Sequence, residues 1–223
     1  YGTTRNKWDS IIPLDELWKQ YERIIKDKGA IVLTAQTPFD KVLGCSNLKL
    51  LRYEWIWQKD NASNFLNARR NPMKIHENIL VFYKKMPNYQ PQMRDGFTPY
   101  STKGRASKLS DHYMKNFKPS DTGSSNGERF PISVLQFNIE RGLHPTQKPV
   151  ALFEYLIKTY TNEGEIVLDN CMGSGTTAIA CLNTDRQYIG FELDETYHEL
   201  SLERIENRRK QLSLFEVSHE ANP

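Results

Sequence analysis

The sequence has few cysteines, no long apolar run and no recognisable leader. Its three cysteines, Cys45, Cys171 and Cys181, lie far apart and include no CxxC pair, which argues against a disulfide framework and against a zinc site built from thiolates. No stretch of about 18 apolar residues is present, so no membrane-spanning helix is expected. Because no charged and then apolar leader opens the sequence, we expect a cytoplasmic protein with reduced cysteines.

What the sequence does contain is typical of a globular protein. Of its 223 residues, 38% are hydrophobic and 26% are charged, and this length and composition predict one domain, or one domain with an insertion, around a full core. The first residue is Tyr1 and not a methionine, so we expect the chain to be a fragment of a longer gene product.

The small net charge of +3 conceals an uneven distribution. The segment 59–118 contains twelve Lys and Arg against four Asp and Glu, a net charge of +8, which leaves −5 for the rest of the chain. Such a segment is typical of a surface that binds a polyanion, although a solvated basic face would give the same pattern.

Hydrophobic periodicity predicts an ordered first part and an irregular middle. Apolar residues at helical spacing predict a helix over 14–28 that ends at Gly29, and short apolar runs predict strands over 30–34, 50–58 and 78–83. Trp55 and Trp57 lie on one side of the second strand and are expected in the core. Residues 84–142 are rich in Pro, Gly, Ser, Asn and Lys, which predicts a long irregular region that is either functional or disordered.

The last part of the chain predicts an alternating α/β unit. Helices are expected over about 150–160, 176–184 and 194–210, with strands over 165–169 and 187–192. A strand, a helix and a second strand in this order predict parallel pairing with a right-handed crossover. Cys181 falls inside the middle helix and is expected to be a small buried apolar residue.

A glycine turn with two acids indicates a cofactor site. Asp169 ends the first of these strands, Gly173 and Gly175 precede the helix, and Glu192 ends the next strand. Glycines at such a turn let the backbone approach a ligand, and an acid at the tip of the second strand is well placed to accept both hydroxyls of a ribose. The unit is therefore predicted to bind a nucleoside-containing cofactor.

Asp169 bears on the identity of that cofactor. The pattern Gly173-x-Gly175-x-x-Ala178 also satisfies the dinucleotide fingerprint, so a nicotinamide-dependent oxidoreductase stays an alternative. A carboxylate four residues before the first glycine would repel a pyrophosphate, whereas it would pair well with the ammonium group of a methionine moiety. S-adenosylmethionine is therefore favoured over a dinucleotide, and a purely structural glycine turn is the third interpretation.

Three motifs resemble one enzyme family. The segments 143–152 (LHPTQKPVAL), 167–177 (VLDNCMGSGTT) and 190–193 (GFEL) look like the C-terminal half of β-class amino-methyltransferases of DNA, which make N6-methyladenine or N4-methylcytosine. The opening Tyr1-Gly2-Thr3-Thr4 resembles the end of their catalytic Asp-Pro-Pro-Tyr or Ser-Pro-Pro-Tyr signature and the residues directly after it. The order of the motifs resembles the permuted β class from the first residue to about residue 210.

The resemblance implies a fold, a cofactor and a division of the chain. The fold would be an α/β, Rossmann-like S-adenosylmethionine-dependent methyltransferase fold, with a catalytic half over 1–83, an irregular target-recognition insertion over 84–142 and a cofactor-binding half over 143–223. Glu192 would take the ribose hydroxyls, and Leu193 would pack on the adenine. The methionine end would be held by Asp169, by the turn residues Gly173, Ser174, Gly175 and Thr176, and by His144, Thr146 and Lys148.

The resemblance also assigns Tyr1 as the catalytic residue present in the chain. Its ring would stack on a target base swung out of the duplex, a contact worth about 1–3 kcal/mol. The opening residues resemble adenine enzymes, so N6 of adenine is the favoured target and N4 of cytosine the alternative. A catalytically silent DNA-binding remnant is a further alternative, because the Asp-Pro-Pro before Tyr1 is missing from the sequence. One departure from the family is Asn170-Cys171, where Pro-Phe is frequent.

The basic middle region is the predicted DNA reader. An enzyme that modifies a base amine must flip the nucleotide, so it needs cations for the phosphates and an adaptable segment for base edges. The predicted DNA contacts are Arg69, Arg70, Lys84, Lys85, Lys103, Arg105 and Lys108. A homodimer and a cognate restriction enzyme are possible partners. His76 and His112 have no partner at metal-ligand spacing, so no metal is expected.

Overall fold

The computed structural model describes residues 10–103 and 122–220 of the chain. It divides into two compact units, one formed by residues 91–132 and the other by the rest of the chain. In the part of the chain that is described, no helix is both long and apolar enough to cross a membrane.

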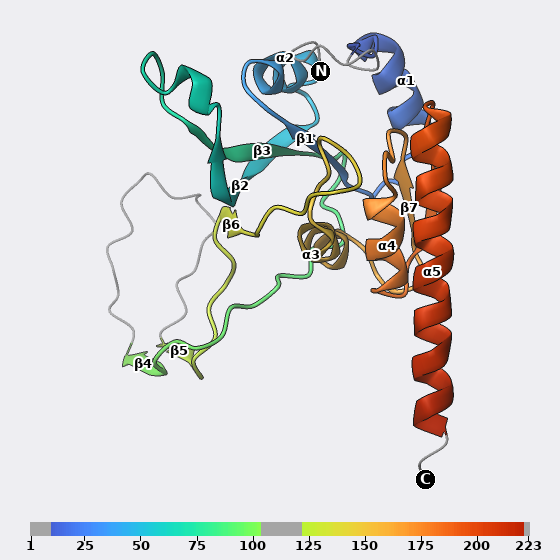
Figure 1. Ribbon diagram of the computed structural model, residues 1–223. Helices are drawn as coiled ribbons and strands as arrows, with labels where there is room; N and C mark the ends of the chain where they lie inside the picture. The colour runs from blue at the N-terminus through green and yellow to red at the C-terminus, as the bar shows by residue number, and fades with distance from the viewer. Residues whose placement is uncertain (1–9, 104–121, 221–223) are drawn as a thin grey trace. The chain divides into compact units, whose positions relative to one another are not determined.

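The larger unit contains a four-stranded sheet (Figure 1). Its strands are β1 (Ile31–Ala35), β3 (Lys74–Phe82), β2 (Leu51–Ser63) and β6 (Val134–Gln136), in that spatial order. The strand β3 runs antiparallel to both of its neighbours, and β6 lies parallel to β2. The pairing of Ile31 with Phe82 and of Ala35 with Asn78 fixes the register of β1.

Both faces of this sheet are buried. On one face, Leu80 and Phe82 pack against Trp18 of α1 (Leu14–Ile24) and Leu43 of α2 (Phe39–Ser46). On the other face, Ile79 and Val81 pack with the two tryptophans of β2 and with α3 (Val150–Tyr160). A strand that is buried on both faces has a continuous apolar sequence, as the ILVF run of β3 does. The expected burial of Trp55 and Trp57 is confirmed.

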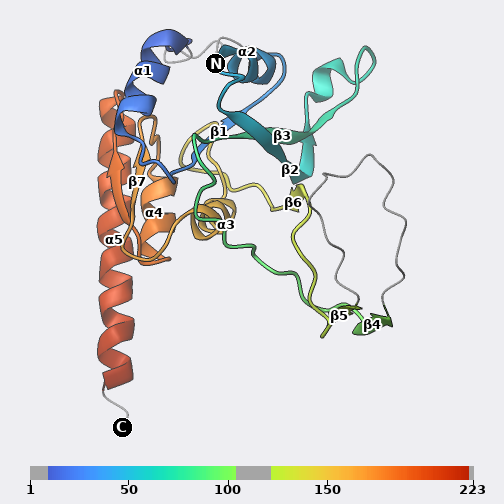
Figure 2. The ribbon, with the colours of Figure 1, turned by 180° about the vertical axis from the view of Figure 1, so that it is seen from behind.

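The second sheet is the predicted strand-helix-strand unit. The strands β7 (Ile166–Asp169) and β8 (Gln187–Gly190) pair in parallel and are joined by α4 (Thr176–Leu182), so the predicted parallel pairing is confirmed. The helix α5 (Glu195–Glu220) runs alongside α4, as seen from behind in Figure 2, and its Ile205 packs against Ile179. Cys181 is buried next to Ile157 of α3, as expected.

Each sheet has an open edge towards one cavity. Among the described strands, β1 pairs with β3 alone and β7 pairs with β8 alone. Residues of both β1 and β7 line the same cavity of about 2120 Å³. Ile166 and Ile189 of the second sheet are exposed, although their side chains are apolar. Residues of an edge strand from each sheet therefore form part of the cavity wall.

Several element boundaries differ from the sequence-based expectation. The first helix ends at Ile24 because Ile25 already has an extended backbone, with φ −67° and ψ 133°. The helix α2 was not predicted, since its eight residues include Gly, Cys and Ser, which are poor helix formers. The second and third predicted strands are both longer than expected, because the polar residues between them also pair as an antiparallel hairpin. These residues are held by backbone hydrogen bonds and have no apolar pattern that would predict a strand. The last helix continues past residue 210 to Glu220.

The smaller unit, residues 91–132, is less irregular than predicted. The strands β4 (Tyr100–Lys103) and β5 (Thr122–Ser125) pair antiparallel, and Arg94 and Arg129 form an isolated bridge. The guanidinium group of Arg129 lies over the rings of Tyr100 and Phe97, at 4.6 and 5.3 Å from their centroids. Backbone pairing and cation–π contacts thus order a region that carries no apolar periodicity.

Candidate functional site

The glycine turn brings the backbone of α4 against α5. Gly175 precedes α4 with a φ of +79°, in the left-handed region that favours glycine. A Cβ atom at this position would lie 3.2 Å from Cβ of Ser201 on α5. Glycine at 175 is therefore required both by the backbone conformation and by the close approach of the second helix.

Asp169 ends β7 at the start of this turn and lines the cavity. Its carboxylate accepts hydrogen bonds from the hydroxyl of Thr177 and from the backbone N–H of Cys171, at 3.0 Å for the latter. Burial raises the pKa of Asp169 above its ordinary value, the negative charge of Glu192 adds to the rise, and the two donors oppose it. A carboxylate in this position gains by pairing with a cation, because a neighbouring positive charge offsets the cost of burial.

Glu192 connects the turns that follow the two parallel strands. One carboxylate oxygen accepts the backbone N–H of Gly173 at 2.7 Å, and the other accepts the N–H groups of Leu193 and Asp194 at 2.9 and 3.0 Å. The side chain of Leu193 is fully exposed. Glu192 thereby holds the glycine turn beside the end of β8.

The segment 143–148 lies over the glycine turn. The ring of His144 would be 3.7 Å from a Cβ atom at Gly173, and it packs edge-on against the ring of Tyr197 with 4.2 Å between the centroids. Its Nδ1 accepts the backbone N–H of Thr146 at 3.1 Å. Burial lowers the pKa of His144, with a smaller contribution from Lys148, while nearby acids oppose the shift. A lowered pKa keeps the imidazole neutral at neutral pH.

Lys148 belongs to a buried ion-pair cluster. Glu77 of β3 is 4% exposed, and its two oxygens lie 2.9 Å from Nζ of Lys148 and 2.8 Å from Nζ of Lys59. Burial alone would raise the pKa of Glu77, but the ammonium groups of Lys148 and Lys59 outweigh it and hold that pKa below its ordinary value. All three residues line the cavity, where they contribute a net charge of +1.

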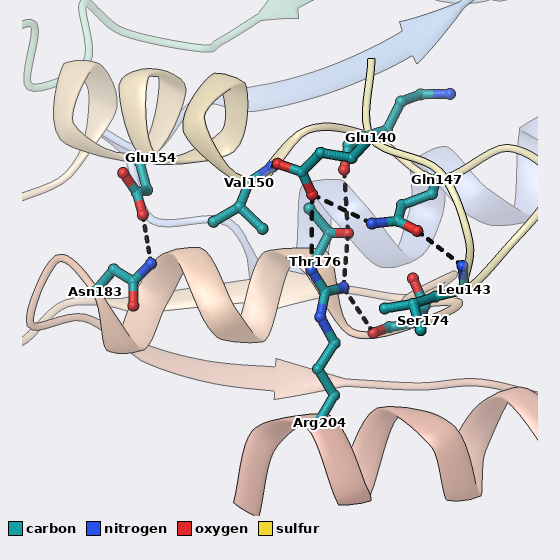
Figure 3. Close-up of polar contacts among 10 residues, drawn as sticks. Glu140, Leu143, Gln147, Val150, Glu154, Ser174, Thr176, Asn183 and Arg204 are labelled. Carbon is teal, nitrogen blue, oxygen red and sulfur yellow. Dashed lines mark hydrogen bonds and ion pairs between the residues drawn. The ribbon is translucent and has the colours of Figure 1, made fainter. Parts of the chain in front are cut away.

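A second polar network anchors the same segment to α5 (Figure 3). Arg204 donates to the carbonyl oxygen of Ser174 at 3.1 Å and forms an ion pair with Glu140 at 3.8 Å. Glu140 also accepts the side-chain N–H of Gln147 at 3.2 Å and the backbone N–H of Val150 at 2.8 Å. The network therefore fixes both ends of the segment 143–148 relative to the glycine turn.

The turn is also held from the first part of the chain. The hydroxyl of Tyr21 on α1 donates to the side-chain oxygen of Asn170 at 2.7 Å. Burial, together with the neighbouring Cys171 and Asp169, raises the pKa of Tyr21 well above its usual range, so the hydroxyl keeps its proton. The hydrogen bond therefore ties Asn170, at the start of the glycine turn, to α1.

The structure brings most of the predicted cofactor residues to one cavity. Asp169, Gly173, Ser174, Thr176, His144, Thr146 and Lys148 line it, whereas Gly175, Glu192 and Leu193 do not. Other residues that hold this site in place were not predicted from the sequence, namely Glu77, Lys59, Glu140, Arg204 and Tyr21. The sequence offered one signal, which is the acidic residue Glu77 two positions before the apolar run of β3. The other partners lie too far apart along the chain to give a local signal.

The predicted DNA contacts are in different surroundings. Arg69 and Arg70 are exposed at the end of the β2–β3 hairpin. Lys84 donates to the carbonyl oxygen of Glu22 at 2.6 Å, and Lys85 forms an ion pair with Asp27 at 2.5 Å. Lys103 lies in β4. The remaining predictions, for Tyr1, Arg105, Lys108 and His112, fall outside the described residues.

The described residues contain no grouping of three or more His, Cys, Asp or Glu side chains that could hold a metal ion. His76 is exposed. The groups that line the cavity include carboxylates, ammonium groups, hydroxyls and backbone amides. Such a set binds a ligand that carries both an ammonium and a carboxylate group, as an amino acid moiety does.

Comparison with known proteins gives the family of the chain. Residues 3–203 match a family model described as DNA methylase. The chain is 27% identical over 202 residues to the DNA adenine methyltransferase YhdJ of Escherichia coli (strain K12). That alignment covers 86% of this chain and 66% of YhdJ, so the chain spans about two thirds of the length of this relative.

Two solved structures are similar over most of the chain. The crystal structure of the M1.HpyAVI–SAM complex gives a TM-score of 0.61 at 26% identity and covers 89% of this chain and 85% of its own. The PvuII DNA methyltransferase, described as cytosine-N4-specific, gives a TM-score of 0.60 and covers 88% of this chain and 75% of its own. The identity to the PvuII enzyme is 15%, so this second likeness concerns the fold.

Proposed function

The chain belongs to the DNA methylase family of N6-adenine and N4-cytosine amino-methyltransferases, and from this membership we propose that it transfers a methyl group from S-adenosylmethionine to N6 of adenine in DNA. Its fold is the Rossmann-like fold of S-adenosylmethionine-dependent methyltransferases, as the sequence predicted. Family membership favours S-adenosylmethionine over the nicotinamide cofactor that the glycine pattern also allowed.

The observation that carries the proposal is the convergence of two sequence motifs on one cavity. Asp169 and the glycine turn line it from one side of the larger unit, and the segment 143–148 covers the turn. The partly buried carboxylate of Asp169 suits the ammonium group of the methionine moiety. The net positive cluster of Lys148, Lys59 and Glu77 suits its carboxylate. The residues present therefore fit S-adenosylmethionine.

When bound, S-adenosylmethionine supplies an electrophilic methyl group on a sulfonium. The chain would bind and orient this group. Glu192, whose carboxylate accepts three backbone N–H groups, stays the residue predicted from the sequence to accept the ribose hydroxyls. Methyl transfer would form a bond between the amine nitrogen and the methyl carbon, break the carbon–sulfur bond with the neutral thioether as leaving group, and release the proton of the nitrogen to solvent. Catalysis by positioning needs neither a metal nor a covalent enzyme intermediate.

Adenine as the target base is the finer part of the proposal. The printed name of YhdJ is that of an adenine enzyme, and its alignment covers most of this chain. Cytosine N4 stays the alternative, since an enzyme described as cytosine-N4-specific has the same fold. Several calls stay predictions, namely the stacking role of Tyr1, a recognition role for residues 84–142, the cytoplasmic location, a homodimer and a cognate restriction enzyme.

The test is methyl transfer from labelled S-adenosylmethionine to mixed-sequence duplex DNA by the full-length protein, followed by nucleoside digestion and mass analysis. Label in N6-methyladenine is expected. Label in N4-methylcytosine would agree with the family but refute adenine as the target base. Bound S-adenosylmethionine without any labelled nucleoside would refute the activity and favour the silent DNA-binding remnant. Asp169→Asn is the matched variant, which should lose cofactor binding and label together.

A further inference from the structure

The end of the β2–β3 hairpin is an ordered apolar projection. Figure 1 shows the hairpin reaching away from the rest of its sheet, with the short 3-10 helix η1 (Phe65–Asn67) at its end. Asn64 has a φ of +71°, and its side-chain oxygen accepts a hydrogen bond from Asn67 at 2.7 Å. The backbone N–H of Arg70 donates to the carbonyl oxygen of Asn67 at 2.8 Å. These bonds give the hairpin end a defined shape.

The two apolar residues of this end face solvent. Phe65 is 75% exposed and Leu66 is 95% exposed, and neither belongs to a core cluster among the described residues. A large apolar pair at the end of a projecting hairpin contributes nothing to the folded core. Adjacent exposed apolar side chains of this kind are typical of a contact with a partner.

The charge around the pair identifies the kind of partner. Residues 61–76 contain Arg69, Arg70 and Lys74 and no Asp or Glu. Arg69 and Arg70 are exposed and take part in no ion pair within the described part of the chain. Apolar residues flanked by arginines, without any acid, complement a polyanion that also offers an apolar interior. Duplex DNA has both properties, with phosphates outside and stacked bases inside.

We propose that Phe65 and Leu66 form a wedge that enters the DNA duplex and fills the space left when the target base is flipped out. The inference depends on the proposed DNA-methylating function and adds a device for opening the duplex. A flipped base leaves an unstacked gap, and an apolar side chain that enters the gap offsets the lost stacking. Arg69 and Arg70 contact the phosphates beside the gap and hold the hairpin in the groove.

The test compares paired and mispaired substrates, once sequencing of methylated DNA has given the target site. Phe65→Ser/Leu66→Ser should lower the methyl-transfer rate on the fully paired duplex by about tenfold or more, since the variant must flip the base without the wedge. A duplex with a mismatch opposite the target base is already partly unstacked and should restore most of the rate. Affinity for S-adenosylmethionine should stay within about twofold of that of the unmodified protein.

Matched variants separate the wedge from its alternatives. Leu214→Ser replaces an exposed apolar residue on α5 and should leave both substrates unaffected. Arg69→Ala/Arg70→Ala should weaken DNA binding for all sequences and reduce the salt slope by about two, without rescue by the mismatch. Equal rates for Phe65→Ser/Leu66→Ser and the unmodified protein on paired DNA would overturn the proposal. A change from dimer to monomer in sedimentation, caused by Phe65→Ser/Leu66→Ser, would also overturn the proposal, because it would show that the hairpin end is a contact between subunits. If the unmodified protein methylates no DNA, the proposed function fails and the wedge with it.

Discussion

Replacing Glu77 by glutamine tests the buried ion-pair cluster beside the glycine turn. The carboxylate is 4% exposed and balances two ammonium groups, those of Lys59 and Lys148, which are 14% and 19% exposed. Glutamine keeps the size of the side chain and one acceptor oxygen, but it leaves two nearly buried positive charges without a counterion. The perturbation is therefore electrostatic and opens no cavity.

The expected loss of stability is about 3 kcal/mol at pH 7. Removal of one partner from a buried ion pair costs about 3–5 kcal/mol, because the remaining charge stays desolvated. The lower end of this range applies here, because both ammonium groups retain some contact with water. Lys148 also loses the carboxylate that holds it beside the glycine turn. Affinity for S-adenosylmethionine should fall about tenfold, equivalent to one charge-assisted hydrogen bond of about 1.4 kcal/mol.

The pH dependence of the stability tests independently whether the charge of Glu77 stabilises the folded protein. The pKa of Glu77 is lowered in the folded protein, so its contribution to stability is fully present above the unfolded value of about 4.3. The contribution is lost as the pH falls below that value, through the folded pKa. The unmodified protein should therefore keep its advantage over Glu77→Gln down to about pH 4.3 and lose it as the pH falls further.

Urea unfolding at several pH values, with S-adenosylmethionine titrations at pH 7, measures both effects. The control is the triple replacement Lys59→Met/Glu77→Leu/Lys148→Met, which removes all three charges and should cost much less stability than Glu77→Gln while still losing cofactor affinity. A Glu77→Gln protein within about 1 kcal/mol of the unmodified stability at pH 7 would show that the cluster is solvated and would refute the reasoning.

Two further predictions concern the glycine turn. Gly175→Ala should destabilise the protein by about 1–3 kcal/mol in a thermal unfolding assay. Gly164→Ala is the control, because Gly164 has a similar φ of +75° but no atom within 4 Å of the new Cβ, so this replacement should cost less stability. Equal losses would mean that the close approach of Ser201 is unimportant. As the pH is lowered, affinity for S-adenosylmethionine should begin to fall at a higher pH than for an ordinary aspartate, because the raised pKa of Asp169 means that its carboxylate is protonated earlier. Calorimetric titrations from pH 8 to 4 measure this dependence. The same dependence of affinity on pH in Asp169→Asn and in the unmodified protein would contradict the prediction.

The sequence by itself determined the cofactor half of the protein. The turn between Asp169 and α4, the parallel pairing of the flanking strands and the burial of Cys181 all follow from local signals, namely glycine spacing, an acid at a strand end and hydrophobic periodicity. The burial of Trp55 and Trp57 follows from the alternation along one strand. These features involve residues near one another in the chain, so spacing alone is sufficient to predict them.

Tertiary structure alone decided which residues hold the site together. Glu77 meets Lys148 across 71 positions, Arg204 reaches Ser174 from another helix, and Tyr21 bonds to Asn170 across 149 positions. No periodicity links such partners, because their proximity depends on how β3, α1 and α5 pack. The helix α2 and the extended β2–β3 hairpin were missed for the same reason, since backbone pairing and packing there override weak local preferences. The sequence predicted the groups that would contact the cofactor, and packing determined which groups hold them in position.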